Sequence, residues 1–488
     1  MDTMIQLTVP HYVFLLTVLA IFIAIGFRRG VIIPALGGTF LIGVLSSDPD
    51  HPVLDQIVFG VQVLFNALLN AGGELFGIMA VIALMVSMLH SLRAQGADQI
   101  MVAPMKKLMR SPMTAFFVLA ATMYTAAAFF WPTPAVALVG TVLVPVAVRV
   151  GLPALAAAVA INLAGHGMAL SADPIIQGAT RLTAGAAGID SQELLPYTVL
   201  FSLVTGLTAI SIAVYTIRRD MKSGVLKAAT EEEIAAMSDA EPHHGDEHSG
   251  HDELAPGKYA KLLAIGVPIT LGCIAGLMIY RGIFNPAKAI RGGDATALLG
   301  GAATVLLVLA TFAKHGIHAL EGITDYLRSG FYFSIKIFAP IIPIAGFFFL
   351  GNPDHAAAVI GEGTPGYLFD VGNYIGKHLD GNNYAIGFGM TIIGMLTGMD
   401  GSGFSGLPLA GSLAGAIGTG TGVNIAVLAA LGQVAAIFTG GGTLVAWAFG
   451  ACADAGISGI NPSDLVRRNF VPVVTGLIVI TFLAIYLM

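Results

Sequence analysis

Runs of about 20 apolar residues recur along most of the chain, and as helices each is long enough to cross the roughly 30 Å hydrocarbon core of a bilayer. They lie at 11–27, 30–46, 74–91, 197–217, 261–280 and 469–487. The alternation of apolar and polar residues that is typical of a membrane β-barrel does not occur in the sequence. Of all residues, 56% are hydrophobic and only 11% are charged. The pattern therefore predicts an all-α polytopic membrane protein.

Two of the apolar segments are interrupted, at matching places in the two halves of the chain. They read FFWPTPAVALVGT at 129–141 and DGSGFSGLPLAGS at 400–412. Unpaired backbone groups cost several kcal/mol each in hydrocarbon, so such breaks survive only where protein or a water-filled cavity surrounds them. Interruptions at corresponding positions of two halves are typical of the binding site of a secondary transporter.

The two halves repeat one plan. Residues 135–151 align without a gap on residues 406–422, an offset of 271. Each half is expected to run as three spans with an interfacial stretch before the third, a hairpin, a broken span and a final span. The predicted boundaries are 1–217 for the first repeat, with a re-entrant hairpin at 113–149 and a broken helix at 152–173, then a linker at 218–260, then 261–488 for the second repeat, with a hairpin at 383–418 and a broken helix at 422–444.

The distribution of Lys and Arg among the loops sets the expected orientation. Most basic residues fall on the cytoplasmic side if both chain termini lie outside, which also makes the two repeats inverted in the membrane. We therefore expect a bacterial-type inner (plasma) membrane protein with a cytoplasmic central linker. Lys336 is an exception, because it falls inside a predicted span.

The linker is acidic and histidine-rich, with HHGDEHSGHDE at 243–253. Such a run binds Zn²⁺ or Ni²⁺ loosely or is simply solvated, and the lack of a fixed ligand spacing favours the second interpretation. Cys273 and Cys452 form no CxxC motif. There is no Walker A loop, no GxGxxG after a strand and no HExxH. We expect no resident metal or cofactor, no nucleic-acid partner and no enzyme activity.

The tips of the two hairpins are candidate substrate contacts. The first tip consists of Trp131, Pro132, Thr133 and Pro134, in which the prolines prevent helix continuation. The second tip contains Asp400, Gly401, Ser402 and Ser405. A carboxylate deep in a bilayer is costly and by default marks an ion, proton or substrate pathway. The alternatives are a packed proline kink at the first tip and a helix-capping role for Asp400.

The two broken spans carry the other candidate residues. The first, AINLAGHGMALSADP, brings Asn162, His166, Ser171 and Asp173 towards the membrane interior or its far side, and His166 is a candidate proton carrier. The second has Gln433 at the position equivalent to Asn162, followed by five small residues that leave backbone groups free: Thr439, Gly440, Gly441, Gly442 and Thr443. Asn162 and Gln433 also fit a role as hydrogen-bonding residues between helices, His166 a structural donor, and Asp173 a position at the outer interface.

The second half resembles a known class of carriers. The stretch IIGMLTGMDGSGFSGLPLAG, then FTGGGTL and SGINPSDLVRRNF, is similar to the Ion Transporter superfamily, and most similar to the lactate permease family. The matching residues are Thr397, Gly398, Asp400 and Ser402, and then Ser463, Asp464, Leu465 and Arg467. Gluconate, C4-dicarboxylate and citrate carriers share the layout. FTGGGTL stands where Na⁺-coupled dicarboxylate carriers have a different signature. The resemblance implies a homodimer and an elevator-like motion.

These observations predict a secondary-active transporter of a small organic anion, such as a mono- or dicarboxylate, coupled to H⁺ or Na⁺. In this interpretation the hairpin tips and the broken spans enclose the substrate, and the lipid bilayer is the only other partner besides a second copy. Asp400, His166, Asp173 and Ser171 are the candidate coupling-ion residues. The alternative is a cation/proton antiporter on the same scaffold, with Asp173, Asp400 and His166 as the ion site.

Overall fold

The structure is a computed structural model that describes residues 7–27, 29–228, 257–284, 288, 292–376, 382–399, 401 and 403–488. Helices account for 83% of it, and the described residues form no β-strand. Within this part, nine helices are long and apolar enough to cross a membrane. The prediction of an all-α polytopic membrane protein is confirmed.

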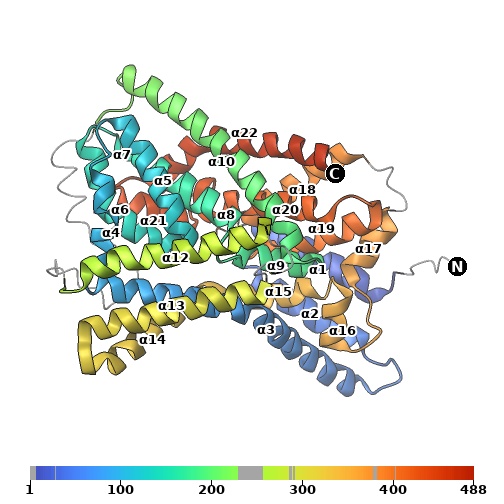
Figure 1. Cartoon of the computed structure of the whole chain (residues 1–488). Coiled ribbons are helices and arrows are strands. Elements are labelled where there is room, and N and C mark those ends of the chain that lie inside the picture. The colour runs from blue at the N-terminus through green and yellow to red at the C-terminus, as the bar shows by residue number, and fades with distance from the viewer. Residues whose placement is uncertain are drawn as a thin grey trace.

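The first half contains two shorter apolar helices, one helix of 41 residues, a helical hairpin, an interrupted helix and a final long helix (Figure 1). The helices are α1 (Val9–Gly26), α2 (Ile32–Ser46), α3 (Val53–Arg93), α4 (Ala97–Lys106), α5 (Pro112–Phe130), α6 (Pro132–Arg149), α7 (Ala154–Ile161), η1 (Asn162–Ala169), α8 (Leu170–Ala172), α9 (Gly178–Ala187) and α10 (Ser191–Lys222).

The second half follows the same order after the linker, most of which lies outside the described residues. Its helices are α12 (Ala260–Phe284), α13 (Gly292–His315), η3 (Gly316–His318), α14 (Ala319–Phe338), α15 (Ile341–Phe349), α16 (Pro353–Ile360), α17 (Tyr367–Gly376), α18 (Asn383–Gly398), α19 (Leu407–Thr421), α20 (Ile425–Phe438), η4 (Thr439–Thr443), α21 (Phe449–Ile457) and α22 (Pro462–Leu487).

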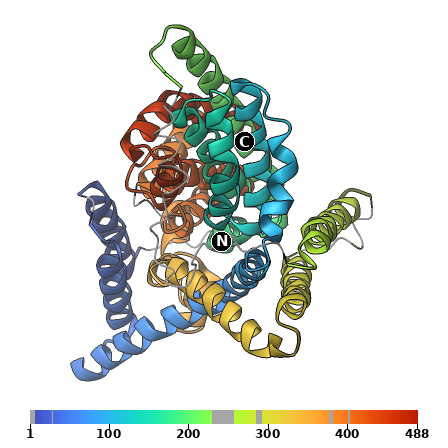
Figure 2. The ribbon, with the colours of Figure 1, turned by 90° about the vertical axis from the view of Figure 1, so that its left-hand side faces the viewer.

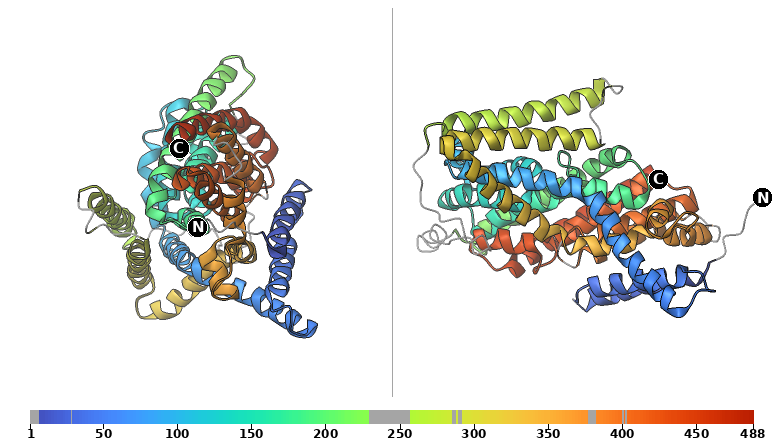
Figure 3. Two further views of the ribbon diagram at one scale, coloured as in Figure 1. Left: turned by 90° about the vertical axis from the view of Figure 1, so that its right-hand side faces the viewer. Right: turned by 90° about the horizontal axis from the view of Figure 1, so that it is seen from below.

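The helices form a compact bundle with arms (Figures 2 and 3). The core bundle comprises α5–α10 and α18–α22, which pack closely on one another across the two halves. The arms comprise α1–α3 from the first half and α12–α14 from the second, and they splay away from the bundle. The helix α3 joins the arms, because it contacts α2 as well as α13 and α14.

Burial distinguishes the bundle from the arms. In the most apolar window of the two interrupted helices, Ala154–Ala172 and Ile425–Thr443, 89% and 94% of residues are buried. The corresponding share is 17% for Val53–Gly77 in α3 and 22% for Ala260–Met278 in α12. The arms therefore expose apolar side chains suited to lipid, while protein surrounds the interrupted helices, as free backbone groups in a membrane require.

The offset of 271 residues recurs in the helix boundaries. It separates the first residues of α7 and α20 (Ala154 and Ile425), of α9 and α21 (Gly178 and Phe449), and of α10 and α22 (Ser191 and Pro462). The shared element order supports an internal repeat. The opposite orientation of the two halves in a membrane stays a prediction, as do the domain boundaries.

One expected feature differs from the structure. The sequence suggested an interfacial stretch before the third span, but α3 is one helix of 41 residues. Three of its four glycines, Gly72, Gly73 and Gly77, have open space around them, whereas Gly60 lies closely against α2. A sharp bend of 82° separates the end of α3 from α4, which begins after Gly96 with its left-handed backbone.

Candidate functional site at the two helix interruptions

The two interrupted spans meet in the centre of the core bundle as π-helical segments, η1 and η4. A π-helix widens the turn and leaves backbone groups outside the regular ladder. Gly442 has φ 120°, which only glycine adopts readily. A side chain at Gly441 would approach the backbone oxygen of His166 to 2.7 Å, so the absence of one allows η4 to lie against η1.

Four polar side chains form a buried cluster at this contact. The Nδ1 atom of His166 lies 2.9 Å from Oδ2 of Asp454, and Asn162 donates to the same Oδ2 at 2.7 Å. Asn162 also donates to the carbonyl oxygen of Gly442 at 3.2 Å, and its own Oδ1 accepts from Asn469 at 2.7 Å. Asn162, Asp454 and Asn469 are fully buried, and His166 is 3% exposed. We call these four residues the His–Asp cluster.

The His–Asp cluster keeps unused hydrogen-bonding capacity. Nε2 of His166, Oδ1 of Asp454 and Oδ1 of Asn469 are buried without a hydrogen-bond partner. Buried polar atoms are normally paired, and unpaired ones mark functional positions or places where a small ligand binds. In the described part of the chain no three His, Cys, Asp or Glu residues converge as a metal site. The direct contact of an imidazole with a carboxylate is an arrangement that can hold and release a proton.

A second, uncharged cluster occupies the equivalent position in the other half. Gln433 donates from Nε2 to the carbonyl oxygen of Ser171 at 3.0 Å and lies 3.5 Å from Oγ1 of Thr180. Its Oε1 atom and Oγ1 of Thr183 are buried without a partner. Thr183 precedes Asp454 by 271 residues, as Asn162 precedes Gln433. The neutral cluster thus has a hydroxyl where the His–Asp cluster has a carboxylate.

The other two polar residues of the first broken span have structural partners. Ser171 donates from Oγ to Oγ of Ser202 at 2.8 Å. Asp173 has a left-handed backbone, φ 36°, and its two carboxylate oxygens accept from the backbone N–H groups of Gln177 at 3.0 Å and Ala179 at 2.9 Å. Asp173 therefore caps the start of α9 and closes the break between α8 and α9.

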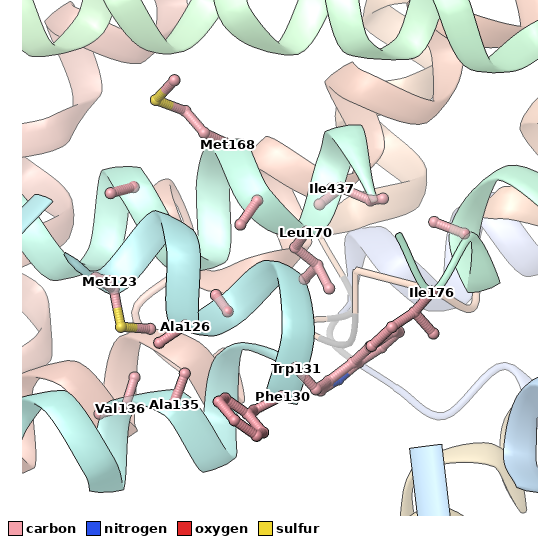
Figure 4. Close-up of a cluster of buried hydrophobic side chains, with 14 of the residues drawn as sticks. Met123, Ala126, Phe130, Trp131, Ala135, Val136, Met168, Leu170, Ile176 and Ile437 are labelled. Atoms are coloured by element: carbon pink, nitrogen blue, oxygen red, sulfur yellow. The ribbon is translucent and has the colours of Figure 1, made fainter. Parts of the chain in front are cut away.

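The first hairpin tip packs against the second segment. Trp131 breaks the helix with φ 72° between α5 and α6, and its ring centroid lies 5.1 Å from that of Phe404. Trp131 also belongs to the large cluster of buried apolar side chains that includes Ile176 and Ile437 (Figure 4). The carbonyl oxygen of Pro134 accepts from Arg93 at 2.8 Å, which ties the tip to α3. Pro132 is buried and Thr133 is half-buried.

The remaining predicted residues lie in η4 and at the second hairpin tip. The hydroxyls of Thr439 and Thr443 donate to the carbonyl oxygens of Ala435 and Phe438 in their own helix, so these two donors are already used. Gly401 has φ 87°, and Ser405 is 6% exposed. Gly440, like Gly441 and Gly442, is buried in η4. Asp400 and Ser402 lie outside the described residues.

Two residues of the His–Asp cluster, Asp454 and Asn469, were not predicted from the sequence. Asp454 is a carboxylate in an apolar segment directly after a break, which is a signal for function that the sequence already contained. Asn469 sits in the last helix, where nothing in the sequence separates it from an ordinary polar residue. Lys336 lies at the end of the candidate span Ala297–Lys336, as predicted, and its side chain is exposed on α14.

Buried interrupted helices inside a bundle of membrane-spanning helices define this chain as a polytopic membrane protein with a transporter-type fold. It superposes on the YdaH transporter of Alcanivorax borkumensis with a TM-score of 0.56 at 14% identity, covering 98% of both chains. It also superposes on MtrF of Neisseria gonorrhoeae, described as one of a class of antimetabolite efflux pumps, with a TM-score of 0.52 at 13% identity, covering 98% of this chain and 95% of MtrF. At these identities the likeness shows the fold alone.

The sequence itself places the chain in a family. It is 34% identical over 481 residues to the uncharacterized membrane protein YhfA of Bacillus subtilis (strain 168), covering 98% of this chain and 97% of YhfA. The chain belongs to the family of YhfA membrane proteins. No family model matches the sequence.

Proposed function

We propose that the chain is a secondary-active transporter of a small organic anion, and that the His–Asp cluster couples transport to a proton. The observation that carries the proposal is the buried contact of His166 with Asp454, held by two amide side chains at the meeting point of the two helix interruptions. A proton bound there neutralises a charge that is otherwise costly to move through the membrane interior.

The neighbouring features fit this function. The first hairpin tip, with Trp131 packed on Phe404, supplies an aromatic wall in the same buried apolar cluster that contains Ile437 of α20. The likeness to two solved transporters supports transport as the activity, and the description of MtrF as an efflux pump makes export a direction to test. The similarity to lactate permeases, the homodimer, the elevator-like motion, the inner-membrane location and the external termini are parts of the same proposal.

The geometry favours H⁺ over Na⁺ as the coupling ion. Sodium ions prefer a shell of several oxygen ligands, whereas the His–Asp cluster presents an imidazole nitrogen and only two unpaired oxygens among the described residues. Imidazole and carboxylate groups are the side chains that most often carry protons in proteins. Asp173, by contrast, has both carboxylate oxygens engaged as a helix cap.

The experiment is a flux measurement on full-length protein in liposomes that contain a pH-sensitive dye. A panel of carboxylates that includes lactate, gluconate, succinate and citrate is added under an imposed pH gradient. We expect at least one of them to move protons in the wild type, and Asp454→Asn to abolish the response to the pH gradient while substrate exchange without a gradient persists. Asp464→Asn is the matched control, because Asp464 is exposed at the start of α22. Proton coupling that survives in Asp454→Asn would overturn the assignment.

A cation/proton antiporter is the second candidate, and the same His166–Asp454 contact favours it. It predicts that Na⁺ or K⁺ alone, without any carboxylate, releases protons from acid-loaded liposomes. The same preparation and dye distinguish the two functions.

A further inference from the structure

A second polar site lies away from the His–Asp cluster, in a cavity of about 380 Å³ between an arm and the core bundle. Its wall comes from α3, from α9, from the start of α10 and from Phe349 at the end of α15. Three charged side chains line it: Glu74, Arg181 and Asp190. The cavity therefore joins the two parts of the molecule that an alternating-access motion would move past each other.

Arg181 is the central feature of this cavity. Its side chain is partly buried on α9, yet its guanidinium forms no hydrogen bond or ion pair with any residue that the structure describes. Burial lowers the pKa of Arg181, and the negative charges of Asp173 and Asp190 only partly oppose that effect. A guanidinium with free donors in a cavity matches a carboxylate, which it holds through two parallel hydrogen bonds.

The two carboxylates that line the cavity favour a ligand with a positively charged group. Glu74 makes no hydrogen bond with the described residues, and Asp190 uses one oxygen to cap α10 through the N–H of Gln192 at 2.8 Å, which leaves the other oxygen free. Two carboxylates against one guanidinium give the lining a net negative charge. A simple anion bound to Arg181 would face this negative charge, whereas a molecule that also carries an ammonium group would pair with it.

The remaining wall is apolar. Leu75, Ile189 and Phe349 line the same cavity, and Leu75 is fully buried beneath it. Such surface suits a hydrocarbon or aromatic side chain next to the two charged groups.

We propose that this cavity binds a zwitterion of the amino-acid type, with its carboxylate on Arg181, its ammonium group on Glu74 and Asp190, and its side chain against Phe349. The inference rests on the proposed transport function and extends its substrate class from simple carboxylates to amino acids and short peptides, which carry an ammonium group beside the carboxylate. The helix that carries Arg181 starts at the break capped by Asp173 and also carries Thr183 of the neutral cluster, so the cavity lies one helix away from the interrupted spans.

The test is a binding measurement on purified full-length protein with the twenty amino acids and a set of dipeptides, each competing against a labelled amino-acid pool. The tightest ligand is then compared with its N-acetyl form, which lacks the ammonium group, and its amide, which lacks the carboxylate. We expect each change to weaken binding at least about tenfold, as for loss of a charge-assisted hydrogen bond. In Arg181→Gln the free acid and its amide should bind with equal affinity. In Glu74→Gln the difference in affinity between the free and N-acetyl forms should become smaller.

Arg328→Gln is the control variant, because Arg328 is exposed on α14 and pairs only with the exposed Asp325 among the described residues. Equal affinity for the free and N-acetyl forms would show that the ligand is not recognised as a zwitterion. Wild-type affinity in Arg181→Gln would show that the ligand does not bind in this cavity. Absence of binding by every amino acid and dipeptide would overturn the substrate class. If simple carboxylates still drive protons through Asp454 in that case, only this inference fails and the transport function stands.

Discussion

Asn162 and Gln433 perform the same task in the two halves of the molecule. Each amide nitrogen donates to a backbone carbonyl oxygen of the opposite interrupted span, Asn162 to Gly442 at 3.2 Å and Gln433 to Ser171 at 3.0 Å. Both the donors and the acceptors are 271 residues apart. The two hydrogen bonds therefore form a reciprocal pair that holds the interruptions together, and they support an internal repeat at the level of single contacts.

The two amide side chains should nevertheless contribute differently to the free energy of unfolding. Asn162→Ala leaves the Gly442 carbonyl, the Asp454 carboxylate and the Asn469 amide each short of a partner, whereas Gln433→Ala mainly frees the Ser171 carbonyl. Hydrogen bonds inside membrane proteins contribute about 1 kcal/mol on average, and loss of a partner for a buried charge costs more. We expect Gln433→Ala to lower the free energy of unfolding by about 1 kcal/mol and Asn162→Ala by at least about twice as much. Reversible unfolding in mixed micelles measures both variants, and equal effects would contradict the larger role assigned to Asn162.

Gly450 should tolerate no side chain. A Cβ atom there would collide with the carbonyl oxygen of Gly441 and lie 2.6 Å from the ring of His166. Gly450→Ala is expected to displace His166, to abolish proton-coupled transport and to cost about 1–3 kcal/mol of stability through overpacking. Gly456 lies on the same helix with nothing within 4 Å, so Gly456→Ala is the control and should leave both transport and the melting temperature near those of the wild type.

Two neighbouring arginines at the start of α22 should behave differently. Arg468 donates to Asp220 on α10 at 2.6 Å and is 19% exposed, while Arg467 is 83% exposed and lies 4.0 Å from Asp464. Arg468→Ala is expected to cost about 1–3 kcal/mol, because it leaves a partly buried carboxylate with less support. Arg467→Ala should cost less than about 1 kcal/mol, as for exposed ion pairs. A thermal melt of both variants checks the order, and a larger loss in Arg467→Ala would show that the α10–α22 ion pair is unimportant.

Protonation of His355, whose Nδ1 atom lies 3.2 Å from Oδ1 of Asn70, should destabilise the contact of α16 with α3 at low pH. Burial lowers the pKa of His355 on α16, although Glu74, the Gly185 carbonyl and Asp354 act in the opposite direction. The unfolded chain therefore binds this proton more readily than the folded one, so the contribution to stability is complete above the usual histidine pKa of about 6.5 and declines as the pH falls below it. Melting temperatures measured from pH 8 to pH 5 should fall less in His355→Gln than in the wild type. An identical dependence of melting temperature on pH in the two proteins would show that His355 is not the cause of the destabilisation.

The sequence predicted the architecture well where a strong physical rule applies. Long apolar runs fix membrane helices, and the two prolines around Thr133 fix the break at Trp131, where the structure turns between α5 and α6. The pairing of Asn162 with Gln433 also followed from the sequence offset, because repeats preserve register.

The chemistry of the site was only partly predictable. His166 and Asn162 were identified, but their partner Asp454 lies 288 residues from His166 in the chain and is brought near only by the packing of α21 on η1. From its position, Asp173 was as good a candidate for a coupling-ion residue as His166. Its carboxylate caps a helix instead, because its backbone adopts a left-handed turn that the sequence did not predict. Asp400 and Ser402, outside the described residues, keep their predicted roles as predictions.

The length of α3 has a consequence for the membrane around the protein. At 1.5 Å per residue its 41 residues extend about 60 Å, twice the thickness of the hydrocarbon layer, so the helix must lie obliquely or continue beyond the lipid. Hydrophobic mismatch is relieved by tilting. Because α3 also contacts helices of both arms, we expect a change in bilayer thickness to change the angle between the arms and the core bundle.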